Sequence, residues 1–254
     1  MEKLSRRSFF KAAGTAAAAL GAQAHGLTSA AEPTAAERGG GAASTAPTAY
    51  MFFQPDEARF IEAATERLIP EDQNGPGALA AGVPNYLDRQ LAGAWGAGER
   101  LYRAGPWREG EPEQGYQLPY TPAELFRNAL RGIREDVQRR RQTSFDKLPV
   151  AEQDAYLESL QKGRQDLQGV PAHVFFESLL ELSIEGFFSD PVYGGNKDMA
   201  AWRMIGFPGA YASFYDLVDQ HGIAYTRPPL SMGDNGRGVI HLHPVRAPAG
   251  KGGR

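Results

Sequence analysis

The sequence of 254 residues contains no cysteine. This absence excludes a disulfide framework, a thiolate metal site, an iron–sulfur cluster and a covalently attached haem. Excess charge is also lacking, because 27 lysines and arginines stand against 30 aspartates and glutamates. A nucleic-acid-binding protein would carry a basic patch or stripe, and this balance offers none. We therefore expect no nucleic-acid partner.

The common catalytic and cofactor-binding motifs are missing as well. No glycines follow the Gly-x-Gly-x-x-Gly frame of a dinucleotide site, and neither a P-loop nor a Gly-x-Ser-x-Gly elbow occurs. His241 and His243 would share one face of an extended segment, but two imidazoles make a weak metal site. Glu185 and Asp190 are the best carboxylate candidates, and capping or loop fixing is their favoured role. We expect no catalytic, cofactor-binding or metal-binding residue in this chain.

Long apolar runs are scarce, and the clearest one belongs to an export signal. Residues 5–11 follow the pattern Ser-Arg-Arg-x-Phe-x-Lys, and residues 12–20 form a weakly hydrophobic stretch that is too short for a membrane span of ~20 residues. Residues 22–24 have the small-x-small form of a cleavage site. The defining positions are Arg6, Arg7, Phe9 and Lys11. Residues 1–24 are thus predicted to be a twin-arginine signal peptide, recognised by the twin-arginine translocase and directing the folded chain to the periplasm.

Composition divides the remainder into three parts. Residues 25–49 are small and polar, which is typical of a flexible linker. Residues 50–225 carry apolar residues at helical spacing, without a convincing β alternation. Residues 226–254 are rich in Pro, Gly and Arg and are predicted to form a tail. The expected fold is all-α: an irregular single-domain helical bundle with long loops, preceded by the signal peptide and the linker.

Proline and apolar spacing place the individual helices. They are expected to begin near Pro55, Pro84, Pro122, Val150 and Pro171, with short helices around Trp202 and over 210–218. Thr121 and Glu124 have the spacing of a capping box. The predicted buried stripe of the helix that follows is Leu125, Ala129, Leu130, Ile133 and Val137. In the helix that begins near Pro84, the inward residues are predicted to be Tyr86, Leu87, Leu91 and Trp95.

Residues 96–120 interrupt the helical pattern with a long aromatic loop. Its aromatic residues are Tyr102, Trp107, Tyr116 and Tyr120. Loops of this length in compact domains are usually functional or disordered, and aromatic content argues against disorder. Two interpretations remain open: the loop packs on a partner or ligand, or its aromatic residues cover the protein's own core.

The signal and the missing cofactor motifs are informative together. Twin-arginine export mostly serves proteins that fold around a cofactor before they leave the cytoplasm. Here the signal is strong, yet no cofactor site is visible. An economical explanation is that the chain carries a partner with it, and that the partner holds the cofactor and lacks a signal of its own.

The most distinctive stretch runs over residues 185–196, with the sequence Glu-Gly-Phe-Phe-Ser-Asp-Pro-Val-Tyr-Gly-Gly-Asn, and continues to Gly-Phe-Pro-Gly at 206–209. An earlier block contains Leu68-Ile69-Pro70, Pro76-Gly77-Ala78 and Tyr86-Leu87-Asp88. Together these segments resemble the gluconate 2-dehydrogenase subunit 3 family. The resemblance extends from about Phe52 to Tyr211.

This resemblance implies a non-catalytic small subunit of a three-part, membrane-associated dehydrogenase. A large flavoprotein of the glucose-methanol-choline type would carry FAD and oxidise a sugar or sugar acid. A multihaem cytochrome c would pass electrons to quinone in the membrane. The small subunit would carry the twin-arginine signal and be needed for maturation and export of the large one. Its expected location is the periplasm, with membrane association only through its partners.

The distinctive stretch also has a physical logic. Asp190-Pro191 favours a turn, Gly194-Gly195 permits positive φ, and Asn196 can cap the next helix. We expect a rigid loop that forms part of the partner interface, with its aromatic members as anchors. The expected interface residues are Phe188, Asp190, Pro191, Tyr193, Gly194, Gly195, Asn196 and Trp202. The alternative is that the loop only locks the core of the bundle.

Two other functions remain open. An independent periplasmic enzyme, with a site that the sequence does not reveal, would show activity as the purified chain alone. A stand-alone carbohydrate-binding module would use the aromatic loop and bind sugar without a partner.

Overall fold

The computed structural model describes residues 49–99, 101–108, 117–163, 165–210, 219–222 and 227–233. The chain divides into two compact units, Met1–Ala49 and Tyr50–Arg254, and every element named below belongs to the second. The expected signal residues, Arg6, Arg7, Phe9 and Lys11, lie outside the described residues. So does most of the helix expected at 210–218.

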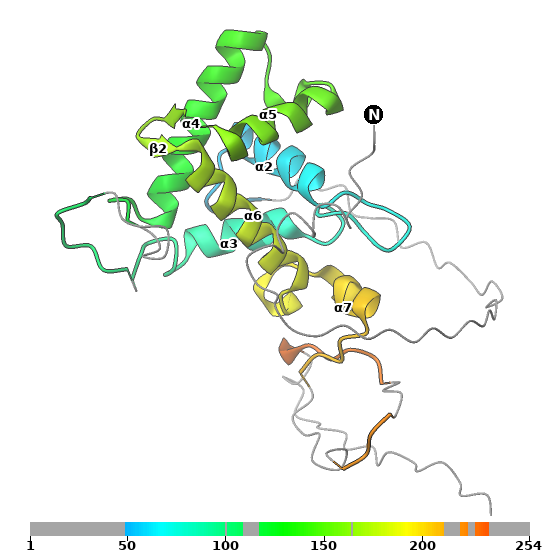
Figure 1. The fold of residues 1–254 in the computed structure, drawn as a ribbon. Helices are drawn as coiled ribbons and strands as arrows, with labels where there is room; N and C mark the ends of the chain where they lie inside the picture. Colours follow the sequence, from blue (N-terminus) through cyan, green and yellow to red (C-terminus); the bar gives the residue numbers. More distant parts are fainter. Residues whose placement is uncertain are drawn as a thin grey trace, which may run out of the picture. The chain divides into compact units, whose positions relative to one another are not determined.

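The described part of the second unit is mainly helical, as the sequence predicts (Figure 1). Its α-helices are α2 (Pro55–Leu68), α3 (Val83–Ala92), α4 (Pro122–Arg141), α5 (Val150–Lys162), α6 (Ala172–Phe188) and α7 (Ala200–Ile205). Its short 3-10 turns are η3 (Phe145–Lys147), η4 (Pro191–Tyr193) and η5 (Lys197–Met199). One small antiparallel hairpin, β1 (Asp166–Leu167) and β2 (Val170–Pro171), departs from the all-α expectation. Two residues per strand are too few for a period-2 pattern to be visible in the sequence.

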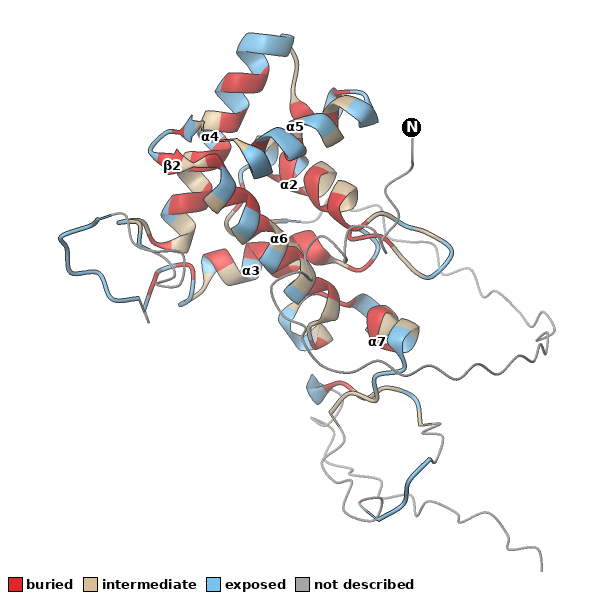
Figure 2. Ribbon diagram, viewed as in Figure 1, coloured by how far each residue is buried: buried red, intermediate tan, exposed pale blue. Residues whose placement is uncertain are grey.

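Helix α6 lies at the centre of the packing. It contacts α2, α3, α4, α5 and α7. Its buried residues are Ala172, Phe175, Phe176, Leu179, Leu182, Ser183, Gly186 and Phe187. The ring of Phe175 meets that of Phe126 from α4 edge-on, with centroids 5.2 Å apart. Burial of such apolar surface contributes about 25 cal/mol per Å², so this helix is the main apolar support of the fold (Figure 2).

Helix α4 begins and packs as its sequence predicts. The Thr121 hydroxyl accepts a hydrogen bond from the Glu124 amide at 3.2 Å, and the Glu124 carboxylate accepts one from the Thr121 amide at 2.7 Å. This is the predicted capping box. All five residues of the predicted stripe are buried. Local sequence therefore determines both the start of this helix and the face that it turns to the core.

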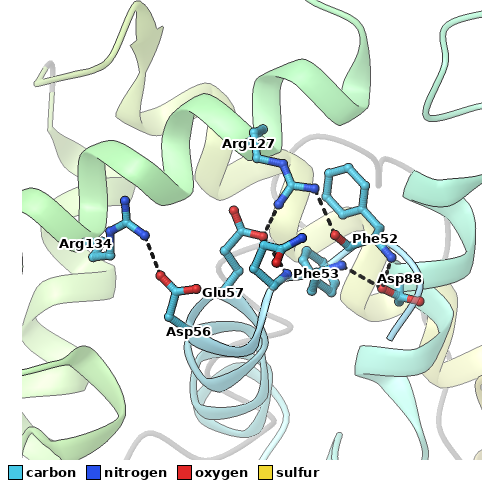
Figure 3. Close-up of polar contacts among 8 residues, drawn as sticks. Phe52, Phe53, Asp56, Glu57, Asp88, Arg127 and Arg134 are labelled. Carbon is cyan, nitrogen blue, oxygen red and sulfur yellow. Dashed lines mark hydrogen bonds and ion pairs between the residues drawn. The ribbon is translucent and has the colours of Figure 1, made fainter. Parts of the chain in front are cut away.

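The segment before α2 is held by a carboxylate on α3. Asp88 accepts hydrogen bonds from the amides of Met51 at 2.7 Å, Phe52 at 2.8 Å and Phe53 at 3.0 Å. Only 3% of Asp88 is exposed. A buried carboxylate is tolerated only when hydrogen bonds or a cation compensate its charge, and here three consecutive backbone amides do so. Figure 3 shows the contacts of Asp88 with Phe52 and Phe53.

Arg127 on α4 binds the same segment from the other side. Its guanidinium donates to the Phe52 carbonyl at 2.8 Å and pairs with Glu57, while it lies 4.1 Å from the centroid of the Phe52 ring. Two turns further along α4, Arg134 pairs with Asp56 (Figure 3). Residues 51–57 are therefore bound to both α3 and α4. We call the contacts of Asp88 and Arg127 with this segment the N-terminal clamp.

Two regions differ from the sequence-based expectations. Trp95 is 45% exposed, so the prediction that it points inward is wrong. Helix α3 ends at Ala92, and the helical spacing that would bring residue 95 to the core stops there. Within the expected tail, Leu230 bonds through its amide to the Pro208 carbonyl at 3.1 Å and through its carbonyl to the Ala210 amide at 2.7 Å. Residues near 230 are thus attached to the segment after α7.

The N-terminal clamp can be tested by the Asp88→Ala substitution. We expect the free energy of unfolding to fall by about 2–4 kcal/mol, because three amides lose their common acceptor in a largely buried place. Chemical denaturation of the purified chain would measure it. Glu71→Ala removes an exposed carboxylate and serves as the matched control. Equal stability of Asp88→Ala and the unmodified protein would show that the clamp contributes little.

Candidate functional site

The candidate site is the loop of residues 189–199 that joins α6 to α7, which we call the α6–α7 loop. It contains η4 and η5 and carries most of the residues that the sequence marks as a partner interface. Three of its residues that are not glycine have left-handed backbone, namely Asn196, Asp198 and Met199. Such a conformation is unfavourable for most side chains, so other contacts must hold the loop in place.

Asp190 supplies the first of these contacts. Its carboxylate accepts from the Val192 amide at 3.0 Å, which is the predicted Asp-Pro turn, and also from the Ser231 hydroxyl at 2.6 Å and the Met232 amide at 2.8 Å. Burial acts to raise the pKa of Asp190, but these hydrogen bonds outweigh it and the pKa lies below its usual value. The ionised carboxylate therefore joins the loop to residues 231–232, which the sequence did not place near it.

Gly194 and Gly195 are required in the loop for different physical reasons. Gly194 has φ of 100° and so adopts the left-handed conformation that the sequence predicts. Gly195 does not have a positive φ, although a glycine would permit one. A Cβ atom there would lie 2.1 Å from the carbonyl oxygen of Gly186 on α6. Gly195 is thus needed because the loop passes directly against the helix backbone.

The Asn196 side chain forms hydrogen bonds at both ends of the loop. It is fully buried. Its side-chain amide donates to the Ser189 carbonyl at 2.9 Å, and its side-chain oxygen accepts from the Ala201 amide at 2.9 Å. The second bond satisfies an amide in the first turn of α7, although the N-cap position of that helix is Met199. The next amide, of Lys197, bonds to the Ala81 carbonyl at 2.9 Å and ties the loop to the turn before α3.

The expected aromatic anchors occupy three different environments. Trp202 is only 6% exposed, and its indole N–H donates to the Phe188 carbonyl at 2.8 Å. Its position fits the alternative of locking the core. Phe188 itself is half-buried and meets Phe187 edge-on. Tyr193 is 48% exposed. Of the three rings, that of Tyr193 is the most available to a partner.

Other exposed apolar residues lie near Tyr193 in the sequence or are bonded to the loop. They are Val192, Ile205, Phe207 and Met232, each close to half exposed. A Cβ atom on Gly233 would lie within 4 Å of the Val192 side chain, so the segment of Met232 adjoins the loop. Scattered exposed apolar residues are ordinary, but a set held on one bonded unit can mark a binding surface. Met232 could not be found from the sequence, because its place depends on the bond to Asp190.

Glu185, the other candidate carboxylate, is exposed and accepts a hydrogen bond from the Tyr86 hydroxyl at 3.3 Å. Burial and then the charge of Glu185 raise the pKa of Tyr86 to about 12. Tyr86 thus keeps its proton at neutral pH and serves as a donor. Within the described residues, no group of three or more His, Asp or Glu side chains is arranged to hold a metal ion. His241 and His243 lie outside those residues.

The aromatic loop forms a second surface feature. Tyr102 is 83% exposed and Trp107 39% exposed, and both line a hollow of about 260 Å³ together with Tyr120. Tyr116 lies outside the described residues. The exposure of Tyr102 and Trp107 does not fit a role in covering the core. Their surfaces face solvent in the isolated chain.

The role of Asn196 can be tested by Asn196→Ala. The change leaves the buried Ala201 amide and Ser189 carbonyl without partners and places alanine at positive φ. It should therefore lower the local stability of the loop by about 2–3 kcal/mol. Hydrogen exchange at the Ala201 amide would measure this opening directly. Exchange in α4 provides the internal reference, since the side-chain hydrogen bonds of Asn196 go to Ser189 and Ala201 and do not involve that helix. Unchanged exchange at Ala201 would contradict the assigned role.

Of three comparisons with known proteins, one assigns the chain to a family. No curated protein and no solved structure matches the chain. The family model described as gluconate 2-dehydrogenase subunit 3 matches residues 55–209. The match begins at the start of α2 and ends just after α7, so it includes Asp88 and the whole α6–α7 loop. It covers more than half of the sequence, and the chain therefore belongs to the gluconate 2-dehydrogenase subunit 3 family.

Proposed function

We propose that this chain is a non-catalytic escort, which stabilises and co-exports the FAD-containing large subunit of a gluconate or related sugar dehydrogenase. The family name makes it one subunit of a gluconate dehydrogenase complex. The observation that carries the finer proposal is the α6–α7 loop, which holds Val192 and Tyr193 half exposed on a frame of internal hydrogen bonds. Apolar groups on a rigid frame suit a docking surface, because little freedom is lost on binding.

The export part of the proposal rests on the sequence. The twin-arginine pattern at residues 5–11 would direct a folded chain, together with any partner bound to it, to the periplasm. In this arrangement the large flavoprotein of the glucose-methanol-choline type needs no signal of its own. A multihaem cytochrome c is the second proposed partner and would take electrons from the flavin to the membrane. No helix among the described residues is long and apolar enough to cross a membrane, and we propose attachment through these partners.

The proposed roles of the three subunits follow from the redox chemistry of the reaction. Oxidation of a sugar alcohol or aldehyde needs a redox cofactor to accept the electrons. We assign FAD to the large subunit and haem to the cytochrome. The contribution of this chain is then a surface: it would cover apolar area on the large subunit and stabilise its folded, flavin-bound state by mass action.

The first experiment is a tagged pull-down of the full chain from periplasmic and membrane fractions, with an absorbance spectrum of the eluate. We expect a flavin spectrum and a co-purifying protein much larger than this chain. Removal of the twin-arginine pair by Arg6→Lys and Arg7→Lys should leave both proteins in the cytoplasm. A colourless, solitary chain recovered under mild conditions would overturn the proposal. It would then be natural to test the aromatic loop for sugar binding.

The exposed tyrosine gives a second prediction. Tyr193→Ala should weaken co-purification of the flavoprotein by about tenfold or more, as expected for loss of an aromatic anchor. The stability of the free chain should not change, because the side chain is half exposed. Trp202→Ala is the contrasting variant and should lower the free energy of unfolding by about 3 kcal/mol. Tyr102→Ala, in the aromatic loop, controls for loss of an exposed tyrosine elsewhere. Full binding by Tyr193→Ala would remove this residue from the interface.

A further inference from the structure

The exposed edge of α6 carries a row of carboxylates. Glu177, Glu181 and Glu185 follow one another at intervals of four residues, so they lie on the same face of the helix, and all three are exposed. Within the described residues, no lysine, arginine or histidine forms an ion pair with any of them. Glu185 has only the neutral Tyr86 hydroxyl as a donor. We call these three residues the carboxylate row.

Mutual repulsion within the row is visible in its central member. Burial first, and then the charges of Glu177 and Glu185, raise the pKa of Glu181. Like charges four residues apart destabilise a helix. Several other acidic residues of the helices are paired with arginines, as Asp56 is with Arg134 and Asp136 is with Arg139 and Arg140. The row places three consecutive like charges on one helix face without such a partner.

Glu185, the last residue of the row, lies near the exposed part of the α6–α7 loop. Tyr86 bonds to Glu185, and Tyr193 is among the residues close enough to raise the pKa of the Tyr86 hydroxyl. Gly195 of the loop touches the carbonyl of Gly186, the residue after Glu185. The Glu185 end of the row therefore lies near the half-exposed Tyr193, and we treat the row and this part of the loop as one face. The Arg89 side chain lies beside Gly194.

We infer that this face docks a protein surface in which an apolar patch is bordered by lysine or arginine side chains. The apolar part would meet Val192 and Tyr193, and the cations would meet the carboxylate row. This rests on the proposed function, because the occupant is taken to be the large flavoprotein subunit. The choice follows from charge complementarity: cations opposite the row relieve a repulsion that the isolated chain does not relieve.

The same charges argue against other occupants. A second copy of this chain, paired about a two-fold axis on this face, would bring one carboxylate row near another. A bilayer rich in anionic lipids would repel the row as well. A basic, partly apolar protein surface satisfies both the row and the exposed apolar side chains of the loop.

The test uses Glu177→Lys/Glu181→Lys in the full chain, co-expressed with the flavoprotein subunit. We expect affinity for the flavoprotein to fall at least tenfold at ~0.1 M salt, and the difference from the unmodified protein to shrink at ~1 M salt, where the Debye length falls from ~10 Å to ~3 Å. The matched control, Glu71→Lys/Glu99→Lys, makes the same change in net charge on exposed residues elsewhere and should bind normally.

A second variant separates docking from a structural role. Glu177→Gln/Glu181→Gln removes the repulsion without adding charge, so the thermal midpoint of the free chain should stay the same or rise while binding weakens. Lower stability of the free chain together with normal binding would overturn the inference. So would normal binding by the lysine variant. If the unmodified chain itself captures no flavoprotein, the proposed function fails instead, and the two failures are thereby distinguished.

Discussion

The carboxylate of Asp88 is the interaction on which the first half of the domain depends. It sits on α3 and collects three consecutive amides, so the segment before α2 has one position relative to that helix. Because α2 begins directly after this segment, its start is fixed at the same time. Arg127 extends the constraint to α4 by binding a carbonyl of the segment and pairing with Glu57. A buried charge that loses its partners is costly, and the three helices are therefore joined by a polar contact as well as by their apolar faces.

Sequence reasoning succeeded where the relevant contacts are local. The capping box at Thr121 and the buried stripe of α4 involve residues three to four positions apart, and both are read from spacing alone. It failed where contacts are distant. The role of Asp88 depends on amides more than thirty residues away, and the role of Asp190 depends on Ser231. The family resemblance included Asp88 in a recognisable block, but no local pattern showed which groups it would bind.

The aromatic residues of the candidate site illustrate the same division. Composition indicates that Tyr193 and Trp202 belong to one distinctive stretch, yet one is half exposed and the other is buried. The difference arises from the fold of the loop, which turns Tyr193 outward and closes the start of α7 over α6. The turn at Asp190 and the positive φ of Gly194 are present as the sequence indicates, and Asn196 bonds to the first turn of α7. The sequence could not divide the loop into residues that build it and residues that it presents.

If the chain acts as the proposed escort, it must bind its partner before export, so its docking face has to exist in the free chain. The α6–α7 loop would meet this requirement, because it is held by hydrogen bonds from Asp190, from Asn196 and from the turn before α3. A segment that folds on binding would instead lose part of its interaction energy to ordering. The carboxylate row has the same property, since α6 is held by its apolar face against five other helices. This packing offsets the repulsion among Glu177, Glu181 and Glu185 on the exposed side of α6. The three carboxylates would therefore already be in position to bind a cationic surface.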